Sequence, residues 1–146
     1  MEEFSSDLIE NLYGNPHSAS SPSALASRRI DAIRERALRF FHADPDEFDM
    51  VFVTNATAAI KMTIECIRDH AAASNTSVWY GYHRDSHSSL VGVRELTKLH
   101  RCFTSDEEVE TWINGGERRG ARSRRIGLFA YPGQSNMTGR RLPLSW

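Results

Sequence analysis

Three short segments of this 146-residue chain carry polar side chains of the kinds that bind small charged ligands. They are Thr54-Asn55-Ala56-Thr57, His83-Arg84-Asp85-Ser86-His87-Ser88-Ser89 and Pro132-Gly133-Gln134-Ser135-Asn136-Met137-Thr138-Gly139. We expect each of them to follow a β-strand directly. In an open parallel sheet, ligands bind beyond the carboxyl ends of the strands. Together the three segments therefore predict one site for a polar ligand.

The first segment has the features of a phosphate site. Met50–Val53 is apolar throughout and is typical of a buried strand, and a helical pattern runs from Ala56 to about Ala72. The loop between them places unpaired backbone N–H groups and the Thr54 and Thr57 hydroxyls at a helix N-terminus. The helix dipole is positive there, and this favours an anion such as phosphate.

Each segment also allows a simpler interpretation. The polar residues of the first could only cap the helix, and Asn136 could hydrogen-bond its own turn. His87 could cap the next helix or fill a gap in the packing. His83, Asp85 and His87 alternate in sequence and would line up as metal ligands if their segment were extended. A single ligand would explain all three segments at once.

Strands and helices alternate along most of the chain, which predicts βαβ units, a mostly parallel sheet and a three-layer α/β/α architecture. The tract 1–21 is polar and rich in turn residues, and within it Tyr13–Ser18, with Gly, Asn and Pro together, predicts an irregular loop. The expected strands cover 50–53, 77–80, 100–103 and 126–131. The expected helices run from an N-cap at Ser21 to before Asp44, from Ala56 to about Ala72, from Ser86 or His87 to Leu96, and from the capping box Ser105–Glu108 to Gly115-Gly116.

Composition limits the possible partners. The formal net charge of −1 does not suggest a nucleic-acid or an anionic-membrane partner, and we interpret the basic tract 116–125 as a solvated surface loop. The sequence contains no run of about 18 apolar residues, the length that a membrane-spanning helix needs. The acidic N-terminus lacks the features of a signal peptide, so we expect a cytoplasmic protein. Cys66 and Cys102 form no metal motif, and we expect Cys66 to lie in the core.

Four stretches resemble the molybdenum cofactor sulfurases, which are relatives of cysteine desulfurases in the class V aminotransferase group. The stretches are Leu12–Ser18, Phe52–Lys61, Arg84–Glu95, and Phe129–Gly139 with Arg141–Trp146. They follow the family's order and extend from about residue 12 to the end, with Tyr13–Ser18 and Asp85–Glu95 the most specific. The resemblance implies that residues 1–146 are part of the large domain of a fold type I transferase that depends on pyridoxal phosphate (PLP).

The resemblance also assigns cofactor contacts. The backbone amides of Ala56 and Thr57 would hold the phosphate, and His87 would stack its imidazole on the pyridine ring. Asn136 would hydrogen-bond the ring hydroxyl oxygen, with Gln134 as a lesser candidate. No metal ligand is implied.

In the complete family enzyme, sulfur passes from L-cysteine to the molybdenum cofactor. The lysine that forms the Schiff base, the acid that keeps the pyridine nitrogen protonated and the cysteine that carries the persulfide lie beyond the segments matched here. Lys61 and Lys98 are the chain's only lysines, and neither stands where the family places that lysine. We therefore expect weak cofactor binding and no catalytic residue or turnover in this chain alone.

Two alternatives stay open at this point. The chain could be a catalytically inactive interaction module that forms a homodimer or pairs with a full-length relative. It could also be an unrelated α/β phosphate-binding domain. Cysteine desulfurases and other class V enzymes share the segments that carry the resemblance.

Overall fold

The computed structural model describes residues 2–115 and 125–146. Its residues fall into two compact units, the first ending at Phe52 and the second covering Val53–Trp146. Each unit is described by itself. The basic tract predicted to be a surface loop, and Gly116 of the predicted helix end, lie outside the described residues.

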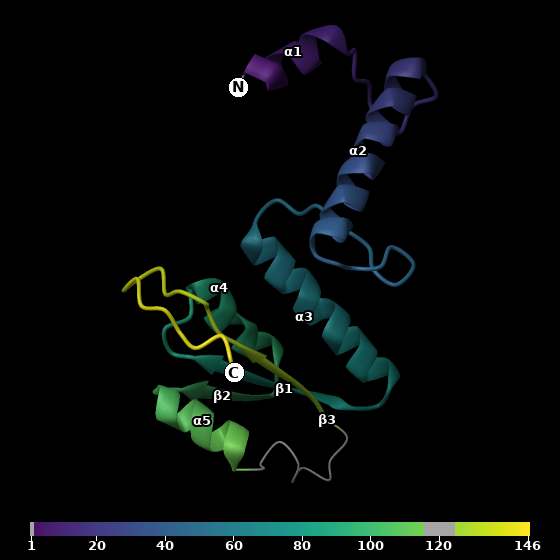
Figure 1. The fold of residues 1–146 in the computed structure, drawn as a ribbon. Helices are drawn as coiled ribbons and strands as arrows, with labels where there is room; N and C mark the ends of the chain where they lie inside the picture. Colours follow the sequence, from purple (N-terminus) through teal and green to yellow (C-terminus); the bar gives the residue numbers. More distant parts are fainter. Residues whose placement is uncertain (1, 116–124) are drawn as a thin grey trace. The chain divides into compact units, whose positions relative to one another are not determined.

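The first unit holds two helices, α1 (Glu2–Glu10) and α2 (Ser21–Phe40) (Figure 1). No helix was predicted for the polar residues of α1, whereas the irregular loop predicted at Tyr13–Ser18 is confirmed, since no helix or strand lies between α1 and α2. Contacts with later residues hold α1 in place, since the Asp7 carboxylate accepts a hydrogen bond from the Tyr13 hydroxyl and pairs with Arg29 at 3.4 Å. A reading of local composition does not detect such contacts.

Helix α2 confirms the expected second helix, with a shift of one residue at its start. Ser20, not Ser21, is the N-cap, and its hydroxyl accepts a hydrogen bond from the backbone N–H of Ser23 at 3.3 Å. Pro22 stands in the first turn, where its missing N–H costs nothing.

The predicted strand at 50–53 does not form. Val51 and Phe52 are more than half exposed, and within the described residues no strand pairs with this stretch. An apolar run becomes a strand only where a neighbour accepts its backbone hydrogen bonds. The sequence pattern contains no information on whether such a neighbour is present.

The second unit is built on a three-stranded parallel sheet, which confirms the expected fold class. Its strands are β1 (Ser77–His83), β2 (Leu99–Phe103) and β3 (Arg125–Ala130), in the order β2-β1-β3. In the register of this sheet, Gly81 of β1 lies beside Arg101 of β2 and Phe129 of β3. Because all three strands run the same way, their carboxyl ends meet at one edge.

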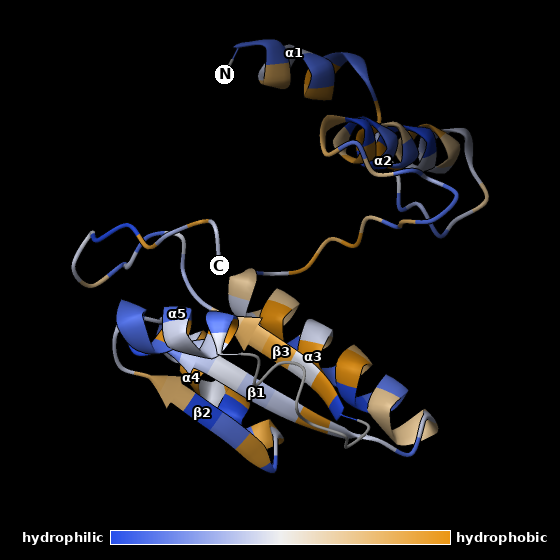
Figure 2. Ribbon diagram, turned by 60° about the horizontal axis from the view of Figure 1, so that its bottom comes forward, coloured by the Kyte–Doolittle hydropathy of each residue, from blue (hydrophilic) through white to orange (hydrophobic). Residues whose placement is uncertain are grey.

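Helix α3 (Ala56–Ala73) packs against β1 and β3 on one face of the sheet. Ile64, Tyr80, Tyr82 and Val93 are buried together there, and Figure 2 shows the apolar residues of α3 and β3 that contribute to this layer. The expected helix from Ser86 or His87 to Leu96 is present as the short α4 (Ser88–Val91) followed by the 3₁₀ turn η1 (Gly92–Leu96).

Helix α5 (Asp106–Asn114) contacts β2, and its Trp112 covers the opposite face of the sheet. The expected N-cap is present, since the Ser105 hydroxyl accepts from the N–H of Glu108, but the Glu108 carboxylate accepts at 2.7 Å from the N–H of Thr104, one residue before the N-cap that a capping box would use. Trp112 stacks on Trp79 of β1, with ring centroids 5.2 Å apart. Helices thus cover both faces of the sheet, as the predicted three-layer arrangement requires.

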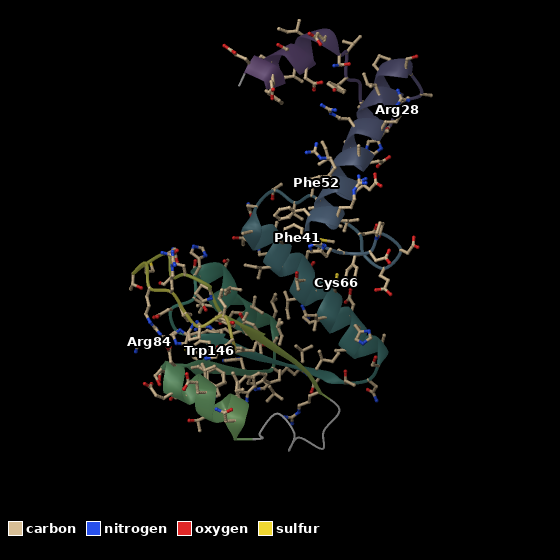
Figure 3. The ribbon with its side chains drawn as sticks, viewed as in Figure 1. Arg28, Phe41, Phe52, Cys66, Arg84 and Trp146 are labelled. Carbon is tan, nitrogen blue, oxygen red and sulfur yellow. The ribbon has the colours of Figure 1, made fainter. Side chains whose placement is uncertain are left out.

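Cys66 is exposed on α3, which contradicts its predicted place in the core (Figure 3). The buried Ile64 precedes it by two residues, and two residues turn an α-helix by about 200°. Cys66 therefore points away from the face that packs on the sheet. Cys102 is exposed as well.

Candidate functional site

The carboxyl edge of the sheet gathers the three polar segments on one unit. β1 ends at His83 and β3 at Ala130, and the second and third segments begin at or just after these ends. Only residues 74–76 separate α3 from β1, against which it packs, so α3 runs antiparallel to β1 and begins at the same edge. Figure 3 labels Arg84 at this edge, beyond the end of β1.

The N-terminus of α3 offers two backbone amides to a ligand. Asn55 is the N-cap, and its Oδ1 accepts a hydrogen bond from the N–H of Ala58 at 2.9 Å. The N–H groups of Ala56 and Thr57 lie in the first turn, where an α-helix contains no acceptor for them. The capping interpretation is therefore confirmed for Asn55, and the two amides predicted to hold a phosphate are left for another acceptor.

His87 caps α4 and is exposed. Its Nδ1 accepts a hydrogen bond from the N–H of Ser89 at 3.1 Å and lies 2.8 Å from the Ser89 hydroxyl. These two contacts fix the orientation of the ring. Capping uses only the edge of the imidazole, so the role of cap and the predicted role of stacking on a ring are compatible.

The segment after β3 is a closed loop with its own hydrogen bonds. The buried Ser135 hydroxyl accepts from the N–H groups of Met137 and Thr138 at 3.3 and 3.4 Å. Gly139 occupies the left-handed region, with φ of 72°, where a side chain would be strained. The chain can therefore turn back sharply after the exposed Asn136.

Two amide side chains of this loop differ in their availability. Gln134 donates its Nε2 to the carbonyl of Gly139 at 3.0 Å, so its nitrogen serves the loop itself. Within the described part of the chain, the side chain of Asn136 has no hydrogen bond. The alternative that Asn136 bonds its own turn is therefore not supported, because the Ser135 hydroxyl makes the turn's hydrogen bonds instead. Of the two predicted ring contacts, Asn136 is the one left for a ligand.

Sequence reasoning missed a charged cluster at the same edge. Arg140 donates to the Asp85 carboxylate at 2.8 Å and also to the carboxylate of Asp106, the first residue of α5. The buried His83 lies between them, with its Nδ1 3.1 Å from the N–H of Asp85 and its Nε2 3.5 Å from Asp106. Arg140 is 55 residues from Asp85 and 34 from Asp106 in sequence. Only the parallel register that places β1 beside β2 and β3 could have indicated that they meet.

Burial lowers the pKa of His83, and the effect outweighs the opposing influence of Asp85 and Asp106. Because its Nδ1 accepts a hydrogen bond, the neutral ring carries its proton on Nε2, which has no hydrogen-bond partner among the described residues. The metal-site alternative for His83, Asp85 and His87 gains no support: no group of three or more metal-ligating side chains is found in the described part.

Comparison with known proteins identifies the family. The model of the aminotransferase class-V family matches residues 3–145. The chain belongs to the class V aminotransferases. Proteins described as molybdenum cofactor sulfurase in Aspergillus clavatus and Neosartorya fischeri are each 60% identical to it over 147 aligned residues, and that of Emericella nidulans is 55% identical over 148.

The alignments cover 100% of this chain but 17% of each of these relatives. No solved structure matches the chain significantly. None of the described helices is long and apolar enough to cross a membrane.

Class V aminotransferases depend on PLP, and the donor set at the carboxyl edge fits the two ends of that cofactor. The helix N-terminus at Ala56 and Thr57 suits the phosphate, and the exposed imidazole of His87 suits a flat aromatic ring. The chain's two lysines are poorly placed to bond covalently to a cofactor at this edge. Lys98 directly precedes β2 and so lies at the amino edge of the sheet, while Lys61 is exposed on α3.

Proposed function

We propose that residues 53–146 bind the phosphate and the pyridine ring of PLP in a sulfurtransferase like the molybdenum cofactor sulfurases. The observation that supports this most is that the N-terminus of α3 and the loops after β1 and β3 share one edge of one sheet. No two of these segments are neighbours in sequence. A single ligand that spans the edge accounts for the polar residues of all three.

The proposed contacts divide by chemistry. The amides of Ala56 and Thr57 bind the phosphate, where the helix dipole adds to the attraction. His87 stacks on the ring in the orientation that Ser89 fixes. Asn136 donates its side-chain amide to the ring hydroxyl oxygen. Gln134 keeps only its side-chain oxygen for the site, because its nitrogen is bound to Gly139.

When bound, PLP supplies an electron sink for breaking bonds at the α-carbon of an amino acid joined to it, and a lysine of the enzyme holds the cofactor before the substrate takes its place. Neither Lys61 nor Lys98 is placed for that attachment: one lies more than a helical turn beyond the phosphate-binding amides, and the other lies at the opposite edge. We propose that the 146 residues hold the cofactor without a covalent bond and do not turn over alone. The complete activity, transfer of sulfur from L-cysteine to the molybdenum cofactor in the cytoplasm, belongs to the same proposal, as does dimerisation.

Substitution of His87 tests the stacking role. His87→Asn keeps an acceptor that can cap α4 but removes the aromatic ring. We expect it to weaken PLP binding about three- to tenfold, the value of one aromatic contact, with an unchanged melting temperature. Quenching of tryptophan fluorescence during a PLP titration measures the affinity.

The matched control is His70→Asn, because His70 is an exposed histidine in the last turn of α3, at the opposite end from the site. We expect it to bind PLP as the unsubstituted chain does. Equal PLP affinity of the His87 variant and the unsubstituted chain would contradict the stacking role.

A further inference from the structure

Arg140 connects three segments that are far apart in sequence. Its Nη1 donates to Asp85 in the segment after β1, and its Nη2 donates to Asp106 at the start of α5. Arg140 itself belongs to the loop after β3. We name Arg140, Asp85 and Asp106 the Arg140 clamp.

We propose that Arg140 is a positioning residue for the cofactor site, because its guanidinium fixes the loop that bears Asn136 against the segment that bears His87. The proposal rests on the proposed function, since it concerns the same two side chains. Arg140 itself is not proposed to touch the cofactor.

The loop after β3 can transmit this constraint to Asn136. The N–H of Ser135 donates to the carbonyl of Arg140 at 2.8 Å, and the N–H of Gly139 donates to the carbonyl of Ser135 at 2.9 Å. Asn136 follows directly within this ring of bonds. A loop closed in this way moves as one piece, so holding Arg140 also holds Asn136.

The opposite side of the clamp is equally well fixed. The backbone N–H of Asp85 donates to Nδ1 of the buried His83, and the N–H of Ser86 donates to the carbonyl of His83 at 3.0 Å. The Asp85 side chain is only 17% exposed. His87 follows two residues later, so the anchor for Arg140 and the stacking ring belong to one ordered turn.

The alternative interpretation is an ordinary surface ion pair that adds little to stability. The Arg140 side chain is 40% exposed, and exposed pairs contribute little to the free energy of unfolding. The two interpretations predict different results. A positioning role changes cofactor affinity and the order of the loop far more than it changes the melting temperature.

The test compares Arg140→Gln and Arg140→Lys with Arg141→Gln in the whole chain. Arg141 is the exposed neighbouring arginine and serves as the matched control. We expect Arg140→Gln to weaken PLP binding about fivefold or more, the size of effect seen for coupled neighbours. Arg140→Lys recovers part of the loss, because an ammonium can pair with one carboxylate but lacks the fork that reaches two. The control is unchanged.

Amide hydrogen exchange of the chain without cofactor provides an independent readout. In Arg140→Gln the amides of residues 135–139 and 86–89 exchange faster, while those of α3 do not. If the unsubstituted chain does not bind PLP, the proposed function fails, and this exchange pattern alone decides whether the clamp positions the loops.

Unchanged PLP affinity together with unchanged exchange in Arg140→Gln would overturn the proposal. A loss of affinity that follows only the unfolded fraction would overturn it as well. Should Arg140→Gln fail to fold, Asp85→Ala removes one of the two carboxylates that hold Arg140 and must weaken PLP binding and speed exchange in the same segments.

Discussion

His83 shows how strongly one residue at a strand end depends on its surroundings. Its side chain is fully buried between Asp85 and Asp106, yet its Nε2 has no hydrogen-bond partner among the described residues. Burial is the largest influence on its pKa and lowers it. Folding therefore favours the neutral ring, and protonating this histidine opposes the folded state.

The lowered pKa of His83 predicts that the folded chain loses stability as the pH falls. Above the ordinary histidine pKa of about 6.5, His83 is neutral in both the folded and the unfolded chain and does not change the free energy of unfolding. As pH falls below that value, the unfolded chain takes up a proton that the folded chain resists, so the free energy of unfolding falls by at most about 1.4 kcal/mol per pH unit from this group. Urea unfolding of the chain from pH 7 to 5 measures the loss.

The matched variant is His83→Asn, which keeps an acceptor near the N–H of Asp85 and does not titrate. We expect a flatter pH dependence than in the unsubstituted chain. Identical slopes for the two proteins would show that His83 does not resist protonation in the fold.

Gly81 in the middle of β1 is required for a different reason. A Cβ there would lie 2.5 Å from the Trp79 ring and 3.1 Å from the Phe103 ring. The Trp79 ring is held by stacking on Trp112 and cannot move aside easily. We expect Gly81→Ala to lower the free energy of unfolding by about 1–3 kcal/mol, the usual cost of overpacking.

Gly92→Ala is the control for this substitution, because a Cβ at Gly92 meets nothing within 4 Å. Its unfolding free energy should stay within about 0.5 kcal/mol of the original. The two variants are compared by urea unfolding, and equal stabilities would contradict the close packing over Gly81.

At the scale of elements, helix caps and short connections place the site. The N-caps Asn55 and Ser105 begin α3 and α5 at the carboxyl edge of the sheet, one on each face. Each cap satisfies one amide and leaves others in the first turn. The start of α3 is therefore both a structural boundary and the proposed phosphate contact.

Substitutions at Asn55 separate these two roles. Asn55→Asp keeps the cap and adds a negative charge that the helix dipole tolerates, so stability is retained. The charge repels the phosphate, and we expect PLP affinity to fall about tenfold, since like charges a few ångströms apart cost a kilocalorie or more near a protein surface.

Asn55→Ser is the neutral control and should bind PLP as the unsubstituted chain does. Melting temperature and PLP titration are both measured for the two variants. Full affinity in Asn55→Asp would place the phosphate elsewhere.

The elements that sequence predicts well are those that local residues determine. Ser105 and Glu108 mark the start of α5, and the alternation of strands and helices after Ala56 predicts the parallel sheet. Two of the errors concern long-range partners. Met50–Val53 lacks a paired strand, and the helix at Glu2–Glu10 is held by contacts of Asp7 with later residues.

The same distinction applies to the site. Asn136 and His87 are visible in the sequence because their segments have unusual polar composition, and the structure places both segments at one edge. Arg140 is not visible, because its partners Asp85 and Asp106 are 55 and 34 residues away. Which charges meet is decided by the strand order β2-β1-β3.

At the scale of the whole molecule, every proposed cofactor contact belongs to the second unit, Val53–Trp146. The relatives are several times longer than this chain, which aligns with 17% of their length. We propose that this part of a class V aminotransferase supplies the phosphate and ring contacts, and that neither of its lysines forms the covalent attachment.

Titration of the purified chain with PLP tests that claim most directly, with pyridoxal, which lacks the phosphate, and inorganic phosphate as comparisons. We predict saturable binding of PLP that inorganic phosphate competes away, much weaker binding of pyridoxal, and no increase in protein mass after borohydride reduction. Absence of saturable PLP binding, or a cofactor fixed to Lys61 or Lys98 after reduction, would contradict the account.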